Sequence, residues 1–177
     1  MKNKLFNMLA VMLIAALSTS PVSAASFKLT SSFKLGSLIA YGDISGLGRT
    51  DVTLVLDASG LAATICTNPG QNDVSGQSYP KVSASGFQSL SGNDTTRKNG
   101  KAPFLAETVD PTAIGAGLAG CPSSKWTARV ANILWTNATV TVHQGFDAPN
   151  GPVLLTKNYI CSNQNDATKT IDCVPAP

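Results

Sequence analysis

The residues of this chain best suited to defined chemistry are four cysteines, Cys66, Cys121, Cys161 and Cys173. None belongs to a C-x-x-C pair, which argues against a zinc or redox centre. An even number of cysteines behind a secretory leader predicts two disulfides, with three possible connectivities. Cys161 and Cys173 flank a polar loop and are typical of a local clamp, which leaves Cys66 and Cys121 for each other. Loop closure would make the short bridge worth about 3 kcal/mol and the long one about 4 kcal/mol.

Hydrolytic chemistry finds little support. A serine hydrolase needs a nucleophile, a base and a group that orients the base. The single histidine, His143, ends a predicted strand and is expected to face solvent, and no G-x-S-x-G motif occurs. We therefore predict no catalytic residue of this kind.

A glycosidase needs two carboxylates that face one cleft. Most acids of this chain lie in turn-like segments, where Asp makes local hydrogen bonds. They are Asp43, Asp51, Asp57, Asp73, Asp94, Glu107, Asp110, Asp147, Asp166 and Asp172. We predict a protein that is not an enzyme, and keep a secreted hydrolase with a shallow acidic site as an alternative.

A calcium site is the metal hypothesis that the spacing supports best. Asn68, Asn72 and Asp73 share one loop, and oxygen ligands from loops suit Ca²⁺. The spacing does not match an EF-hand loop, and one carboxylate supplies little charge. We expect turn hydrogen bonding here, with no metal and no cofactor, and leave calcium open as the alternative.

Four aromatic residues, Tyr41, Tyr79, Phe87 and Trp126, could form a binding platform, such as one for carbohydrate. Aromatic side chains on strands more often belong to the core, and we predict that placement for them.

Trp135 differs from those four. It has the opposite parity to the apolar positions between Ala138 and Val142, and polar Thr136 and Asn137 follow it. If exposed, Trp135 would mark a contact surface. It is the one residue that we single out for contact with a partner.

The first 24 residues read as a secretory signal peptide. Lys2 and Lys4 form a basic start, Leu5–Leu17 is apolar, and Val22-Ser23-Ala24 fits a cleavage site. The apolar run is shorter than the ~20 residues of a spanning helix, so an uncleaved anchor is the weaker interpretation. The leader is of bacterial type, and we therefore attribute the glycosylation sequons at Asn93 and Asn137 to chance.

Roughly 150 residues then remain, 25–177, a length typical of one domain. Thirteen basic residues stand against ten acidic ones, and removing Lys2 and Lys4 with the leader reduces the net charge from +3 to +1. Such a balance has no electrostatic footprint for nucleic acid.

The elements that would position these residues are strands, because apolar residues alternate with polar ones and no helical period occurs. In the first half we predict a strand over Phe33–Tyr41 and a turn over 42–48. Arg49–Ala58 and Leu61–Thr67 are predicted to form a hairpin around a tight turn at Ser59-Gly60.

The second half of the chain also contains segments in which apolar and polar residues alternate. Lys81–Leu90, Ala102–Val109, Val153–Cys161 and Thr168–Val174 are predicted strands, and 110–124 is the predicted link between two sheets. Eight or nine short strands in all indicate a β-sandwich.

The stretch Lys125–Gln144 is two alternating runs set end to end, with a break at Asn132–Trp135. We predict a central strand pair or one long bent strand.

Three stretches together resemble a family of small exported bacterial proteins that are known mainly as uncharacterised sequences. They are SGLGRTDVTLVLDASGLAATICTNPGQN, AGCPSSKWTARVANILWTNATVTVHQG and VLLTKNY, and they cover about Leu38 to Tyr159. The resemblance supports pairing Cys66 with Cys121, which both lie inside the shared pattern, whereas Cys161 and Cys173 lie outside it. It implies no activity and no site residues.

Together these patterns predict a secreted, all-β antiparallel sandwich of immunoglobulin-like or Greek-key type, held by two disulfides. Its expected function is extracellular binding, adhesion or structural assembly, with a protein or glycan partner and without membrane-spanning segments. Residues Ala25–Ser32 could add as a strand to a neighbour's sheet, although an ordinary tail is the preferred interpretation. An inhibitor-like module that presents the loop Asn68–Tyr79 is the second alternative.

Overall fold

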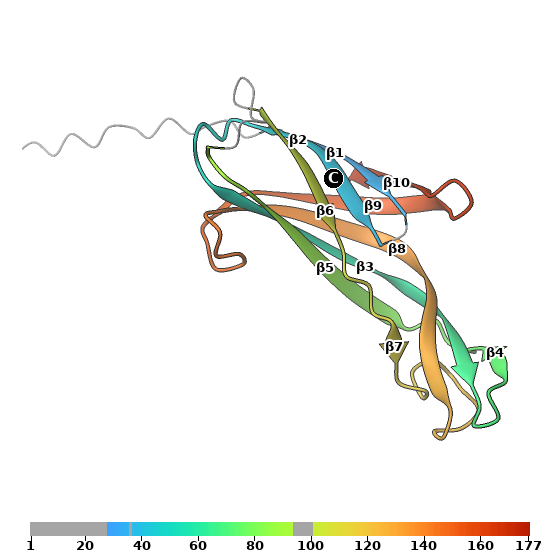
Figure 1. Ribbon diagram of the computed structural model, residues 1–177. Coiled ribbons are helices and arrows are strands. Elements are labelled where there is room, and N and C mark those ends of the chain that lie inside the picture. Colours follow the sequence, from blue (N-terminus) through green and yellow to red (C-terminus); the bar gives the residue numbers. More distant parts are fainter. Residues whose placement is uncertain (1–27, 36, 94–100) are drawn as a thin grey trace, which may run out of the picture.

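The computed structural model describes residues 28–35, 37–93 and 101–177, so the predicted signal peptide lies outside the described residues. The described part contains strands and no helix (Figure 1). The strands are β1 (Lys28–Lys34), β2 (Ile39–Ser45), β3 (Val52–Thr67), β4 (Asp73–Ser75), β5 (Lys81–Leu90), β6 (Lys101–Glu107), β7 (Ala113–Ile114), β8 (Thr127–Gln144), β9 (Val153–Asn165) and β10 (Thr170–Pro175). All their pairings are antiparallel, which confirms the predicted fold class.

The strands form one continuous path rather than two separate sheets. Its order is β5, β3, β8, β9, β10, β1, β2 and β6, with β4 beside β3 and β7 beside β8. The path folds over, so that β1, β2 and β6 lie across a shared core from β3, β5 and β8 (Figure 1). Its two ends meet where Ser85 of β5 bridges Val109, just after β6.

Alternation along each strand creates that core. In β6 the side chains of Ala102, Phe104 and Ala106 are buried, and those of Pro103 and Leu105 between them are exposed. Successive side chains of a strand point to opposite faces, so one face of each strand is removed from water. The buried faces of both layers merge into a single apolar cluster.

The predicted hairpin at Ser59-Gly60 is wrong, because β3 runs unbroken from Val52 to Thr67. Gly60 serves a different purpose there. A Cβ at this position would overlap the carbonyl oxygen of Leu134 in β8. The glycine therefore allows two backbones to approach closely and does not turn the chain.

The first predicted strand and turn are also displaced. The chain reverses between β1 and β2, inside the range Phe33–Tyr41 that we expected to be one strand, and β2 continues to Ser45 through the expected turn. Residues Lys28–Ser32 pair with β2. They are therefore part of this sheet, which corrects the preferred interpretation as an ordinary tail and leaves no free strand there for a neighbour, whereas residues 25–27 lie outside the described residues.

Trp135 is buried, with 1% of its surface exposed, and this corrects its prediction as a contact surface. In the pairing of β3 with β8, Ser59 lies opposite Asn137 and Gly60 lies opposite Trp135. Thr136 is thus an extra residue, a β-bulge, which reverses the direction of the alternation. Trp135 shares the core with Ala138 because of that insertion.

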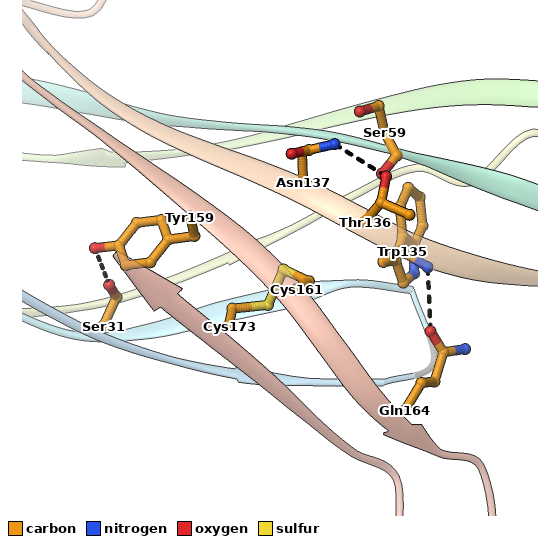
Figure 2. The surroundings of a disulfide bond; sticks show 9 residues. All are labelled: Ser31, Ser59, Trp135, Thr136, Asn137, Tyr159, Cys161, Gln164 and Cys173. Carbon is orange, nitrogen blue, oxygen red and sulfur yellow. Dashed lines mark hydrogen bonds between the residues drawn. A yellow bond between two sulfur atoms is a disulfide. The ribbon is translucent and has the colours of Figure 1, made fainter. Parts of the chain in front are cut away.

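A glutamine side chain continues the sheet beyond this bulge. β9 pairs with β8 only as far as Ile160 and Asn137. The Gln164 amide then accepts a hydrogen bond from the Trp135 N–H at 3.1 Å and donates one to the Ile133 carbonyl at 2.7 Å. Figure 2 shows Gln164 facing the Trp135 backbone in this position. The backbone polar groups next to the buried indole are therefore satisfied.

Beyond the bulge, the outer halves of β3 and β8 project from the layers (Figure 1). We call residues 60–67 and 127–135, together with β4, β7 and the loop 115–124, the arm. A disulfide joins Cys66 of β3 to Cys121 of the loop, with their Cα atoms 5.7 Å apart. The second disulfide joins Cys161 and Cys173 across β9 and β10, with 4.0 Å between Cα atoms (Figure 2). Both predicted pairings are confirmed.

Candidate functional site

The outer face of β5, β3 and β8 carries mostly short polar side chains. Ser85 of β5 lies opposite Asp57 of β3, and Asp57 lies opposite Thr139 of β8. Two residues along, Ser83, Ser59 and Asn137 repeat the arrangement. This face is therefore covered with hydroxyl, amide and carboxylate groups.

Three adjoining hollows follow this face, and we call them together the trough. The first, of about 590 Å³, shares Asp57 and Ser85 with the second, of about 320 Å³. The second shares Ser59, Ser83 and Asn137 with the third, of about 340 Å³. From Val55 to Leu61 along β3 the trough spans roughly 20 Å, at about 3.3 Å per residue.

The first hollow differs from the rest because apolar side chains form it. Val55 and Phe87 lie opposite each other on β3 and β5. Val109 and Pro149, the latter from the loop between β8 and β9, complete its apolar lining. Phe87 and Val109 are 73% and 80% exposed, which is unusual for large apolar side chains.

The position of Val109 in the lining of the first hollow depends on Gly86. A Cβ at Gly86 would overlap the carbonyl oxygen of Glu107. Without a side chain, β5 approaches the end of β6, and the Val109 N–H donates to the Ser85 carbonyl at 2.9 Å. This contact closes the seam between the two ends of the sheet path.

Hydrogen bonds fix the polar side chains of the trough. The Ser85 hydroxyl donates to Asp57 at 2.6 Å. The Asn137 amide donates to the Thr136 hydroxyl, which in turn donates to the Ser59 carbonyl (Figure 2). Each side chain retains further donor or acceptor capacity for a ligand.

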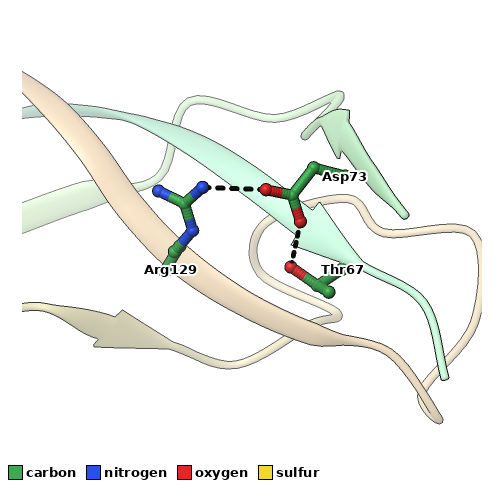
Figure 3. Close-up of polar contacts among 3 residues, drawn as sticks. All are labelled: Thr67, Asp73 and Arg129. Atoms are coloured by element: carbon green, nitrogen blue, oxygen red, sulfur yellow. Dashed lines mark hydrogen bonds and ion pairs between the residues drawn. The ribbon is translucent and has the colours of Figure 1, made fainter. Parts of the chain in front are cut away.

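The loop with Asn68, Asn72 and Asp73, for which calcium was the alternative to turn hydrogen bonding, uses its oxygen atoms internally. Asp73 accepts hydrogen bonds from the Thr67 hydroxyl and the Arg129 guanidinium, as Figure 3 shows. Asn68 accepts from the Asn72 N–H at 2.9 Å. The hydroxyl bond from Thr67, with the Arg129 bond and charge, lowers the pKa of Asp73 below 3.8. Among the described residues no cluster of His, Cys, Asp or Glu side chains is suited to a metal ion.

His143 is buried, although we expected it to face solvent. Its Nδ1 lies 2.9 Å from the carbonyl oxygen of Gly151, so the ring connects β8 to the following loop. It has no position from which to act on a ligand in the trough, whose lining does not include it.

Two acids that we expected to be separate share one hollow. Asp57 and Glu107 come from β3 and β6, yet both line the first hollow of the trough. Asp110, close by in sequence, accepts a hydrogen bond from the Thr108 hydroxyl at 2.7 Å. Burial raises the pKa of Asp110 above 3.8, assisted by the charge of Glu107 and opposed by the Thr108 bond.

The aromatic residues divide into two groups. Phe87 and Tyr79 are exposed, so their predicted core placement is wrong, and Tyr41 and Trp126 are half-buried. Only Phe87 of the four lines the trough. The alternation of β5 places Phe87 on the same face as Ser83 and Ser85, and that signal was present in the sequence.

The described residues include no apolar helix of bilayer-spanning length. Two disulfides are characteristic of proteins that function in oxidising compartments.

Comparisons of this chain with protein-family models, with curated proteins and with solved structures return no match. What the trough can bind therefore has to be argued from its own residues.

Proposed function

We propose that this protein is an exported, non-catalytic binding module that holds an extended glycan chain in the trough. The observation that supports this proposal is the row of short polar side chains, about 20 Å long, with the exposed ring of Phe87 at one end. Ligand sites are typically concave, with a few placed polar groups and an apolar surface.

A glycan suits the floor of the trough better than a peptide strand does. β3 pairs with β5 on one side and with β8 on the other from Val52 to Leu61. The β3 backbone at the floor of the trough is therefore fully paired and cannot add a peptide strand. Recognition must come from side chains, and serine, threonine, asparagine and aspartate match the donors and acceptors of sugar hydroxyls.

The ring of Phe87 would supply the apolar part of the interaction. Sugar rings present C–H groups on one face, and a flat aromatic surface of about 150–250 Å² offers a large apolar contact. The exposure of Phe87 leaves that contact available.

Export is part of the same proposal. The predicted leader and the two disulfides support a bacterial extracellular or surface location. An extracellular module of this kind would meet polysaccharides of a matrix or a cell wall.

The test is binding of the disulfide-bonded chain to a panel of insoluble and soluble polysaccharides. We expect Phe87→Thr, which keeps a β-favouring residue, to weaken binding about tenfold. The matched control is Tyr79→Thr, which removes an equally exposed aromatic residue outside the trough and should bind like the parent. Failure to retain any polysaccharide, or equal binding by Phe87→Thr, would contradict the proposal.

A hydrolase is the second candidate, because Asp57 and Glu107 line one hollow. Glycosidases use such a pair at defined separations. The same panel distinguishes the two functions, since release of new reducing ends that disappears in Asp57→Asn would identify an enzyme. Retention of intact polysaccharide supports the binding module.

A further inference from the structure

We infer that the first hollow of the trough selects a cationic sugar unit, an amino sugar with a free amine. This inference rests on the proposed glycan-binding function and adds the chemical class of the unit bound at the Phe87 end. It is carried by the combination of an apolar surface and two carboxylates in that one hollow.

The apolar part of the hollow can hold the body of a sugar ring. Phe87 and Val109 expose most of their surface, and Val55 and Pro149 line the same space of about 590 Å³. Isolated exposed apolar residues are ordinary, but four that line one hollow mark a contact site.

The charge at the hollow is negative. Asp57 receives a hydroxyl hydrogen bond from Ser85. Among the described residues the ion pair is Arg129–Asp73, in the arm, and neither Asp57 nor Glu107 has a cation at ion-pairing distance. A positively charged ligand group would therefore be attracted to this hollow.

The far end of the trough carries the opposite charge. Lys81 lines the third hollow, and it lies four residues along β5 from Ser85, roughly 13 Å away. The charge along the trough thus changes from negative, at Asp57 and Glu107 in the first hollow, to positive, at Lys81 in the third. A ligand amine would be favoured at one end of the trough only. The hollow would therefore select the amine at one position of the bound glycan, rather than prefer positive charge in general.

An ammonium group meets the requirements of this hollow. It carries three donors and a compact charge, and hydrogen bonds between ionised partners are about twice as strong as neutral ones. An N-acetylated sugar of the same size has an amide in place of the ammonium, so it keeps the ring contact with Phe87 and loses the charge.

The test compares two β-1,4-linked oligomers of equal length, one of glucosamine and one of N-acetylglucosamine, by calorimetry in the same buffer. We expect the amine-bearing oligomer to bind about tenfold more tightly, the ratio for one charge-assisted contact. Raising the salt concentration should reduce that ratio.

The double variant Asp57→Asn with Glu107→Gln should remove the preference, so that the ratio of the two oligomers' dissociation constants falls to about one. The amide oxygen introduced by Asp57→Asn can still accept the Ser85 hydrogen bond, so the fold is retained, as a thermal melt would verify. The matched control is Asp43→Asn, an exposed acid of β2 that lines none of the three hollows.

Equal binding of the two oligomers by the parent protein would overturn this inference and leave the glycan proposal intact. A preference that survives the double variant would also overturn it. Binding of neither oligomer, nor of any other polysaccharide, would instead contradict the proposed function itself.

Discussion

Gly86 shapes the candidate site by having no side chain. Because a Cβ there would overlap the Glu107 carbonyl oxygen, β5 and the end of β6 would have to separate if alanine replaced it. We predict that Gly86→Ala lowers the free energy of unfolding by about 1–3 kcal/mol, as overpacked sites do, and displaces the wall formed by Val109. Urea unfolding measures the first effect, and oligosaccharide affinity the second.

A suitable control is Gly117→Ala. A Cβ at Gly117 would meet no atom within 4 Å, and its backbone is not in the left-handed region. Its free energy of unfolding should stay within about 0.5 kcal/mol of the parent. If both variants lost the same stability, the close approach at Gly86 would not be the cause.

Asp73 gives the arm a dependence on acid pH. Its pKa is lowered in the folded protein, so its contribution to stability is present above 3.8 and is lost as the pH falls through the folded pKa. We predict that the parent loses stability below pH 3.8 more steeply than Asp73→Asn does. Unfolding in urea at a series of pH values measures the difference.

The pKa of Asp110 is shifted in the opposite direction to that of Asp73. Its pKa is raised, mainly by burial, so its contribution to stability is present below 3.8 and is lost as the pH rises through the folded pKa. Asp110→Asn should therefore deviate from the parent in the reverse sense to Asp73→Asn. Deviations of the two variants in the same direction would show that the named contacts do not control these groups.

At the scale of elements, the arm is fastened by the disulfide between Cys66 and Cys121, 55 residues apart in sequence. Beyond the bulge the outer half of β8 pairs with β3 and the two-residue β7, and β9 does not accompany it. The arm therefore has less core of its own than the layers do, and the covalent bond compensates for this.

We predict that Cys66→Ser with Cys121→Ser loosens the arm before the layers. Amide hydrogen exchange should accelerate over 60–67 and 127–135, and the stability loss should approach the loop-closure estimate of about 4 kcal/mol. The comparison is Cys161→Ser with Cys173→Ser, which opens a loop of 12 residues and should cost about 3 kcal/mol without affecting the arm. Uniform exchange across the molecule in the first variant would contradict a separately unfolding arm.

The bulge at Thr136 explains why strand parity misled the interpretation of β8. Apolar and polar residues alternate in the sequence on each side of the bulge, and this alternation breaks at residues 132–135. The extra residue reverses the side to which Trp135 points, and nothing local shows that the reversal leads into the core. The Ser59-Gly60 dipeptide on the facing strand favours a turn, whereas Gly60 allows the close approach of β8.

At the scale of the whole molecule, the candidate site exists because the folded path brings its two ends together. Asp57 lies on β3 and Glu107 on β6, yet the contact of β5 with the end of β6 places them at one hollow. The loop between β8 and β9 adds Pro149 from a third part of the chain. The amino-sugar prediction belongs to this scale, because it needs residues from all three parts.

The amino-acid pattern is sufficient for the strand-rich class, for the buried face of regular strands such as β6, and for both cysteine pairings. The first two features depend on side-chain alternation, which is local, and the short spacing of Cys161 and Cys173 leaves Cys66 and Cys121 for each other. The reversal of Trp135, the burial of His143 and the trough depend on which strands become neighbours. Strand neighbours are chosen by non-local packing and by single close backbone contacts, as at Gly60 and Gly86, and these contacts leave no periodic trace in a sequence.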